Sequence, residues 1–557
     1  MNIKNIICIG FVGIFLLYFA SIGVDVMDID AAQYASMCRE MLENNSFLQI
    51  YDLQFDYLDK PPLLFWLGSL SIKIFGVNNF AYKFPSILAA IFAVYCTYKF
   101  SRLIFNVSIS VLAALILSTC QAWFLITNDI RTDTILAACV IFSFWKLQAA
   151  FTDDCDNKNI NFFFAFVGIG LGLLAKGPVS IVVPVISYSL FFLYKKEYSH
   201  FFRWQYLVGI VIILIILAPM SYGLYQQFDL HPEKNLYDKT NISGLRFFYW
   251  TQSFGRITGE SEWNNGANIS FLFVNMLWSF MPWILFFIVG IFTNLKTIFE
   301  KKDAKRDKSK ILPFIAFSAT YLCLGSSKYQ LPHYIFVVFP MAAIFTAQTI
   351  WEMIEEKKFT LTKNYIHFFQ YVLLLAIVGL CFLITNYIFT SDAYFWNIFL
   401  LLAIVGFYFL WKLPNIWSAY KIVYSSIYVI FIFNVLMTFH FYPQLLTYQL
   451  GNNLGRYISK NKIPVDKTYI IDSPRSHSLC FYGAHIFPIS TLQDSVAKSG
   501  NYIIVDANAY LKLQNKTENY ELINSFSEYR VTMLNWEFLN PITRKNKLDT
   551  YYLLKIL

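Results

Sequence analysis

Charged residues are scarce in this sequence. Asp, Glu, Lys and Arg make up 14% of the 557 residues and hydrophobic residues make up 57%, whereas roughly 25% of a soluble protein is charged. A soluble fold cannot hide that much apolar surface from water, so this composition excludes an ordinary soluble protein. A bilayer accepts such surface, and the composition therefore predicts an integral membrane protein.

Several common signatures are also missing. The nine cysteines are scattered without a C-x-x-C pair, which excludes a zinc ribbon or a disulfide scaffold as the organising feature. There is no Gly-rich nucleotide-binding loop, and no internal repeat, heptad pattern or low-complexity segment. No small-residue cleavage site follows the first apolar run, so residues 5–20 are interpreted as part of an uncleaved first span.

The net charge of +9 does not indicate a nucleic-acid partner. Lys and Arg form short clusters between hydrophobic runs, as at 301–310, and no soluble basic face is present to bind nucleic acid. Such clusters are typical of cytoplasmic loops in membrane proteins.

Apolar runs long enough to cross a bilayer recur along the chain. A hydrocarbon core of about 30 Å needs about 20 apolar residues in a helix. Thirteen spans are predicted, at 5–24, 82–104, 108–127, 133–151, 161–175, 178–194, 205–222, 270–295, 311–326, 332–352, 366–389, 394–412 and 420–440. The shorter run 61–75 follows two prolines and is predicted to be a helix lying at the interface.

The positive charges predict the orientation. With the N-terminus inside, five inner loops are rich in Lys and Arg, and only 152–158 is acidic. Three long segments then lie outside, at 25–81, 223–269 and 441–557. The chain divides into an all-α membrane domain, 1–440, and a small soluble α/β domain, 441–557.

Within that last segment, the runs 469–472 and 502–506 are apolar and each ends in a polar turn. This pattern predicts short buried strands.

Asp30 opens a stretch of the first outer segment in which apolar residues recur at helical spacing. A carboxylate in the first turn of a helix is stabilised by the free N–H groups and the dipole. Asp30 is therefore either a helix cap or a functional carboxylate, and the local pattern does not decide between them.

The stretch Asp59-Lys60-Pro61-Pro62 is a second signal. Two prolines fix an extended backbone before the interfacial helix, which aims Lys60 at a defined place beside the membrane. An ammonium there suits a phosphate at headgroup level. The alternative is that Lys60 only reaches toward lipid phosphates.

Further polar residues occupy the outer connections, most of them short and one the long segment 223–269. They lie in the motifs Asn128-Asp129-Ile130-Arg131-Thr132-Asp133, Lys176-Gly177-Pro178, Arg256…Glu260…Glu262-Trp263 and Lys328…Leu331-Pro332-His333-Tyr334. Each alone is compatible with a turn or a lipid anchor. Because all are placed on one face by the charge argument, together they predict an active site there.

This pattern resembles the GT-C superfamily of membrane glycosyltransferases, and more narrowly the branch of the lipid A aminoarabinose transferases and bacterial protein O-mannosyltransferases. The resemblance covers roughly the first 350 residues. It is carried in order by Asp30…Tyr34…Arg39-Glu40-Met41, Asp59-Lys60-Pro61-Pro62, Arg131-Thr132-Asp133, Lys176-Gly177-Pro178 and Lys328…Leu331-Pro332…Tyr334.

The resemblance implies a role for each matched residue. Asp30 and Asp133 are the catalytic candidates. The residues implied to bind the donor phosphate or the substrate are Lys60, Tyr34, Arg131, Lys176, Arg256, Lys328 and Tyr334. Asp59 stands where the aminoarabinose branch has an acidic metal contact. The resemblance therefore implies a site for a divalent metal at Asp59, with His333 or Glu260 as further ligands. No other cofactor is implied.

The sequence departs from the family in two places. The usual Asp-Glu pair is here Asp30-Ala31, so the second carboxylate is missing. The stretch 259–263 fits no aminoarabinose pattern, which leaves the acceptor open between lipid A and a protein Ser or Thr hydroxyl.

The implied function is inverting transfer of a sugar from an undecaprenyl-phosphate-type donor, by a monomer in a bacterial inner membrane with its active site and C-terminal domain in the periplasm. Two alternatives stay open: a lipid-linked glycan ligase or polymerase, and a polytopic transporter. A transporter would place charges near the middle of its spans, where this sequence has almost none.

Overall fold

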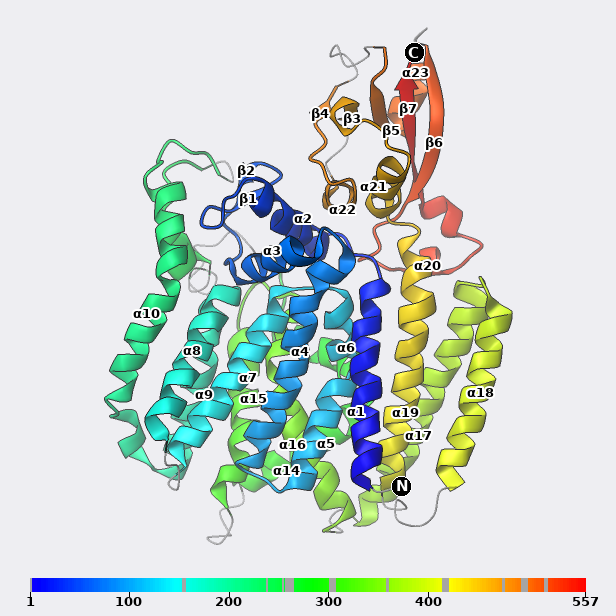
Figure 1. Ribbon diagram of the computed structural model, residues 1–557. Helices are drawn as coiled ribbons and strands as arrows, with labels where there is room; N and C mark the ends of the chain where they lie inside the picture. Colours follow the sequence, from blue (N-terminus) through cyan, green and yellow to red (C-terminus); the bar gives the residue numbers. More distant parts are fainter. Residues whose placement is uncertain are drawn as a thin grey trace.

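The computed structural model describes residues 3–152, 157–236, 239–252, 255, 265–299, 307–356, 360–412, 420–472, 476–491, 499–514 and 519–557. A bundle of long helices carries a small mixed sheet at one end, and the N-terminus lies at the opposite end (Figure 1).

The bundle is built from helices that run between its two ends. In the first half of the chain they are α1 (Ile3–Ala20), α4 (Asn79–Arg102), α5 (Val107–Thr119), α6 (Gln121–Asn128), α7 (Thr132–Phe151), α8 (Lys158–Lys176), α9 (Val179–Lys195) and α10 (Gln205–Leu224). In the second half they are α13 (Ile269–Ser279), α14 (Ile284–Phe299), α15 (Leu312–Gly325), α16 (Phe339–Ile354), α17 (Thr360–Leu383), α18 (Ala393–Lys412) and α19 (Lys421–Leu436).

Within the described residues, eight helices are long and apolar enough to cross a membrane, or nine when α5 and α6, bent by 50°, count as one span. This confirms a polytopic membrane protein. All thirteen predicted spans fall on helices, but the count of thirteen is not confirmed, because the helices at 5–24, 178–194, 270–295 and 311–326 are not among those eight or nine. The predicted span 270–295 is two helices, since the chain turns at Phe280–Trp283 around Pro282.

The first outer segment folds over the end of the bundle that carries the sheet. It contains α2 (Asp30–Glu43), the short hairpin of β1 (Tyr51–Asp52) and β2 (Phe55–Asp56), and α3 (Leu63–Phe75). In Figure 1, α2 and α3 lie above the ends of the bundle helices. The run predicted to be a short helix outside the spans is therefore α3.

The second outer segment holds the π-helical turn η3 (Tyr225–Asp229), α11 (Gly244–Arg246) and a second π-helical turn, η4 (Phe247–Thr251).

After α19, helical turns η9 (Met437–Phe441) and α20 (Tyr442–Leu446) lead to the sheet domain. Its elements are α21 (Leu450–Lys460), β3 (Thr468–Ile471), α22 (His477–Tyr482), β4 (Ile489–Ser490), β5 (Tyr502–Asp506), α23 (Ala507–Gln514), β6 (Tyr520–Glu528), α24 (Trp536–Leu539) and β7 (Asp549–Ile556). The strand order is β4-β3-β5-β7-β6, with β3 parallel to β4 and β5, and β7 antiparallel to β5 and β6. The two predicted strands are β3 and β5. The helical run reaches Leu446, past residue 440, and the division into 1–440 and 441–557 stays a prediction.

The sheet domain touches the segment that leads into α2. Arg456 of α21 forms an ion pair with Asp25, and the Ser478 hydroxyl of α22 donates a hydrogen bond of 2.6 Å to Asp28. The Gln449 amide donates to the Val26 carbonyl at 2.9 Å and accepts from the Asp28 N–H. The sheet domain thus holds the backbone directly before Asp30.

Candidate functional site

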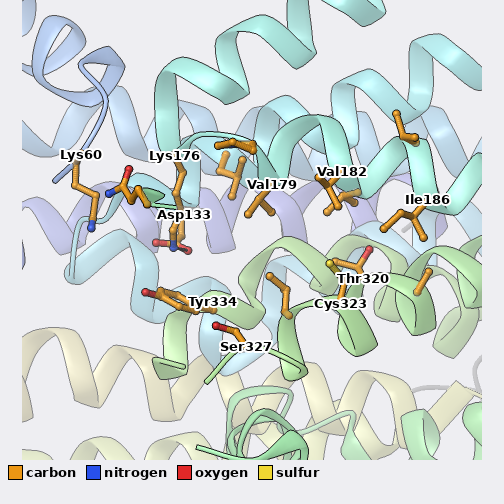
Figure 2. Close-up of a pocket in the computed structure, with 17 residues that line it drawn as sticks. Lys60, Asp133, Lys176, Val179, Val182, Ile186, Thr320, Cys323, Ser327 and Tyr334 are labelled. Atoms are coloured by element: carbon orange, nitrogen blue, oxygen red, sulfur yellow. Dashed lines mark hydrogen bonds and ion pairs between the residues drawn. The ribbon is translucent and has the colours of Figure 1, made fainter. Parts of the chain in front are cut away.

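A cavity of about 440 Å³ opens where the first outer segment covers the bundle. Its walls are mainly α9 and α15, and its polar end is formed by Lys60, Asp133, Lys176 and Tyr334. Figure 2 shows these four side chains gathered at one end, with Val179, Val182 and Ile186 continuing along α9 opposite Thr320 and Cys323. The cavity is therefore polar at one end and an apolar groove along the rest of its length.

Local sequence places Lys176 and Asp133 at helix ends. Lys176 is the last residue of α8, and Gly177 ends that helix at φ +98° before Pro178 starts the next. A glycine there avoids the strain that a Cβ would meet. Asp133 lies in the first turn of α7. The signs of both charges suit the dipoles of their helices.

Lys176 and Asp133 form an ion pair across the cavity end. The two side chains are 13% and 4% exposed. The Lys176 ammonium also lies 4.2 Å from the centre of the Tyr334 ring. Because the pair is buried, loss of one charge leaves the other unpaired in low-dielectric surroundings, which destabilises the fold.

A second ion-paired cluster forms around Arg131, in the turn between α6 and α7. Its Nη1 pairs with Asp30, and its Nε lies 2.8 Å from Asp129 Oδ2. Burial by itself lowers the pKa of Arg131, but the carboxylates of Asp129 and Asp30 outweigh burial and raise it. Asp30 is the first residue of α2, and the cap residue before it, Ile29, makes no side-chain capping bond. Asp30 therefore lies in the first turn, where its carboxylate suits the helix dipole and also pairs with Arg131.

His333 connects the two clusters. It lies in η6 (Pro332–Val338), the 3-10 turn that leads into α16. Its Nδ1 is 3.3 Å from Arg131 Nη1, and its Nε2 is 3.9 Å from Asp133 Oδ2.

Lys60 reaches the cavity from the first outer segment. Its ammonium lies 2.5 Å from Asp59 Oδ2, and Gln252 donates to the other oxygen of Asp59 at 3.0 Å. Gln252 also lines the cavity. Asp59 of the first outer segment and Gln252 of the second thus jointly fix the position of Lys60.

Tyr34 is buried on α2 beside the ion-paired cluster around Arg131. Burial raises the pKa of its phenol well above the ordinary value, and the nearby charges of Asp30 and Asp59 raise it further. The phenol therefore stays neutral and can only donate or accept hydrogen bonds. Another matched residue of α2, Glu40, has a structural contact: its carboxylate accepts from the N–H groups of Leu53 and Gln54 in the hairpin turn.

Most of the residues singled out in the sequence come together at this site. They are Asp30, Tyr34, Asp59, Lys60, Arg131, Asp133, Lys176, His333 and Tyr334. Lys328 is exposed and does not line the cavity. Arg256 and Glu260 lie outside the described residues, so their roles stay predictions.

Two further residues of the site had no role predicted from the sequence: Asp129, which lies in the motif 128–133, and Gln252. The position of Asp129, two residues before Arg131, was a usable signal. Gln252 offered none, since its contact with Asp59 spans 193 positions.

Of the residues implied to hold a metal, Asp59 and His333 lie within the described residues and Glu260 lies outside them. No three His, Cys, Asp or Glu side chains gather as a metal-binding group within that part of the chain. Asp59 is bonded to Lys60 and Gln252, and His333 faces the guanidinium of Arg131. The metal therefore stays a prediction.

Comparison with known sequences matches residues 59–222 to the family described as dolichyl-phosphate-mannose-protein mannosyltransferase. The chain is 25% identical over 341 residues to the undecaprenyl phosphate-alpha-4-amino-4-deoxy-L-arabinose arabinosyl transferase of Wigglesworthia glossinidia brevipalpis, covering 60% of this chain and 57% of that protein. A second enzyme of this name from Proteus mirabilis is 22% identical over 313 residues, covering 55% of this chain and 52% of the relative. These alignments span little more than half the length of each relative.

Comparison with solved structures covers the whole chain. The crystal structure of ArnT from Cupriavidus metallidurans bound to undecaprenyl phosphate aligns with a TM-score of 0.74 and 15% identity, covering 99% of this chain and 98% of that one. The same protein in its apo state aligns with a TM-score of 0.72. The chain thus has the GT-C fold with a small C-terminal sheet domain, as the resemblance implied.

Proposed function

We propose that this chain is an inverting glycosyltransferase that moves a sugar from an undecaprenyl-phosphate-type donor to lipid A. The observation that carries the proposal is the cavity with Lys60 and Lys176 at one end and an apolar groove along the rest.

The shape and polarity of the cavity match such a donor. A polyprenyl tail is uniformly apolar and fits the groove of Val179, Val182 and Ile186 between α9 and α15. Its phosphate is anionic and fits the polar end, where the ammonium groups of Lys60 and Lys176 can donate charge-assisted hydrogen bonds to it. The ArnT structure, with the same fold, contains undecaprenyl phosphate.

The reaction is a single displacement at the anomeric carbon. An acceptor oxygen attacks from the face opposite the polyprenyl phosphate, a new C–O bond forms, and the bond to the phosphate oxygen breaks with its electron pair. The anomeric configuration inverts. Charge grows on the departing phosphate, and pre-placed cations lower the barrier by stabilising that charge. Lys60 and Lys176 line the cavity, and we assign this role to them.

The ion pairs favour a phosphate acceptor over a hydroxyl. Asp30 and Asp133 are each already held in an ion pair, with Arg131 and Lys176, and taking a proton from a hydroxyl acceptor would break that pair. An ionised lipid A phosphate has no proton to lose at the reacting oxygen. The carboxylates then hold Arg131 and Lys176 in place and bind the sugar, and the amino group of an aminoarabinose would suit them.

The orientation proposed from the sequence places this end of the bundle in the periplasm. The positive charges of the inner loops support it, and a donor and acceptor that share the outer leaflet require it.

A transfer assay tests the proposal. Purified protein receives undecaprenyl phosphate carrying labelled 4-amino-4-deoxyarabinose or a hexose, with lipid A or a Ser/Thr-rich peptide as acceptor. We expect label on lipid A, and a loss of about 100-fold or more in kcat/KM for Lys60→Ala, as for removal of one charge-stabilising group. Lys73→Ala, an exposed lysine at the far end of α3, is the matched control.

Label on the peptide but not on lipid A would show that the acceptor is a protein hydroxyl and not lipid A, while the glycosyl-transfer reaction would stand. Equal loss of activity in Lys60→Ala and Lys73→Ala, or no transfer to either acceptor, would overturn the assignment.

A further inference from the structure

The segment 529–548 joins β6 to β7 and is held against the ends of the membrane helices. Val531 is 6% exposed and Phe538 is fully buried. Both belong to one apolar cluster with Ile388, Trp396 and residues of η9 and α20. This side of the segment is an ordinary packed interface.

Polar contacts fix the height of the segment relative to the bundle. Tyr387 donates a hydrogen bond of 3.0 Å to Asn540, and Arg544 donates one of 2.5 Å to the Ile388 carbonyl. Trp536 stacks on Tyr387 with ring centres 6.1 Å apart. Tyr387 and Ile388 end the candidate span Lys363–Ile388. The segment therefore lies at the level where that span leaves the membrane.

The other side of the segment is apolar and uncovered. Met533, Leu534, Trp536 and Ile542 are 61%, 41%, 57% and 82% exposed. Exposure to water of so many large apolar side chains in one short stretch is unusual for a protein surface and marks an interaction site. Tryptophan in particular is enriched at the headgroup level of membranes.

This surface continues onto the bundle. Tyr394 and Phe395, in the first turn of α18, are 82% and 61% exposed. Only a short turn, 389–392, separates them from the end of the preceding helix. Because α18 is itself a candidate span that is 11% buried, its outward face meets lipid. The exposed apolar side chains of the segment and of α18 thus form one apolar surface.

The charges of the segment complement anionic headgroups. Arg530 and Lys545 are exposed, while Lys547 lies 2.5 Å from Glu537. Basic residues beside an inserted apolar group add attraction to acidic lipids.

We propose that the segment 529–548 inserts Met533, Leu534, Trp536 and Ile542 into the lipid headgroup region and anchors the sheet domain on the bilayer. The occupant is the phospholipid leaflet at that end of the bundle. This anchor fixes the height of α21 and α22, which hold the chain before Asp30.

Site-specific photocrosslinking tests the anchor. A benzophenone amino acid replaces Ile542 in full-length protein, which is reconstituted in vesicles of phosphatidylethanolamine and phosphatidylglycerol. The matched control carries the same group at Leu511, which is 57% exposed on α23 at the far end of the sheet domain (Figure 1). Both positions are exposed, so folding is retained, and gel filtration checks it. Mass spectrometry then detects lipid adducts.

The proposal expects several-fold more phospholipid adduct at position 542 than at 511. Equal adduct yields at the two positions, or a crosslink from 542 to a second copy of this chain in place of lipid, would overturn it. Since no sugar transfer is measured, the result is independent of the proposed reaction.

Discussion

At the scale of single residues, Lys176 and Asp133 illustrate how the site stabilises buried charge. We expect Lys176→Met to destabilise the protein by about 3 kcal/mol, because Asp133 is left buried without its cation. The double variant Lys176→Met/Asp133→Leu removes both charges and should recover most of that stability while transfer stays absent. Thermal unfolding in detergent, with the transfer assay in parallel, measures both quantities. A double variant as unstable as Lys176→Met would contradict the assignment of the pair.

Arg131 gives a second prediction at this scale. Its guanidinium reaches Asp30, Asp129 and His333 at once, which a lysine ammonium cannot do. We expect Arg131→Lys to lower kcat by about 10-fold to 100-fold, comparable to the loss of a supporting contact in a catalytic site. Arg102→Lys, at the opposite end of α4 from the site, is the control and should keep wild-type turnover. Similar kinetics for both variants would show that the charge alone suffices at Arg131.

At the scale of elements, we expect the groove between α9 and α15 to bind the polyprenyl tail of the donor, so that affinity depends on the length of the tail. A tryptophan at Val182 would fill the groove, whereas a tryptophan at Leu190, which is exposed on the same helix, would not. Displacing about 50 Å² of apolar contact costs about 1.3 kcal/mol, or roughly tenfold in affinity.

We therefore expect Val182→Trp to raise KM about tenfold for a full-length polyprenyl donor, given that cost. The increase should be smaller for a donor with a short prenyl chain, and Leu190→Trp should change neither KM. Steady-state kinetics with the two donors decide. An equal effect on both donors would indicate that Val182 contacts the headgroup and not the tail.

At the scale of the whole molecule, the sheet domain and the membrane domain meet at Asp28. Burial raises the pKa of Asp28 above its ordinary value, although hydrogen bonds from Ser478 lower it in part. Between about pH 4 and that raised value, the folded protein binds more protons than the unfolded chain. The free energy of unfolding therefore falls as pH rises through this window.

Asp28→Asn removes that titration. We expect the stability of wild type relative to Asp28→Asn to fall as the pH is raised over the measured range, from about pH 4 to about pH 7. Asp466→Asn, at an exposed aspartate of the sheet domain, should show no such trend. Thermal unfolding of the three proteins across this range is the measurement, and parallel curves for wild type and Asp28→Asn would refute the shift.

The sequence by itself determined the membrane class, the helical runs and the end of the bundle where the motifs lie. Run length is a local property that decides whether a helix can cross the bilayer, so α7 and α8 follow from it, and α3 follows from its short run after two prolines. The strands β3 and β5 follow from short apolar runs that end in polar turns. The motif Lys176-Gly177-Pro178 is a turn because glycine accepts a positive φ and proline starts the next helix.

Only the tertiary structure decided which groups meet. Asp30 pairs with Arg131 across 101 positions, and Gln252 holds Asp59 across 193, while Lys328 stays on the surface. The sequence also left open whether Asp30 is only a helix cap. These outcomes depend on which helices pack side by side, and the sequence pattern within one helix does not show which helix lies next to it.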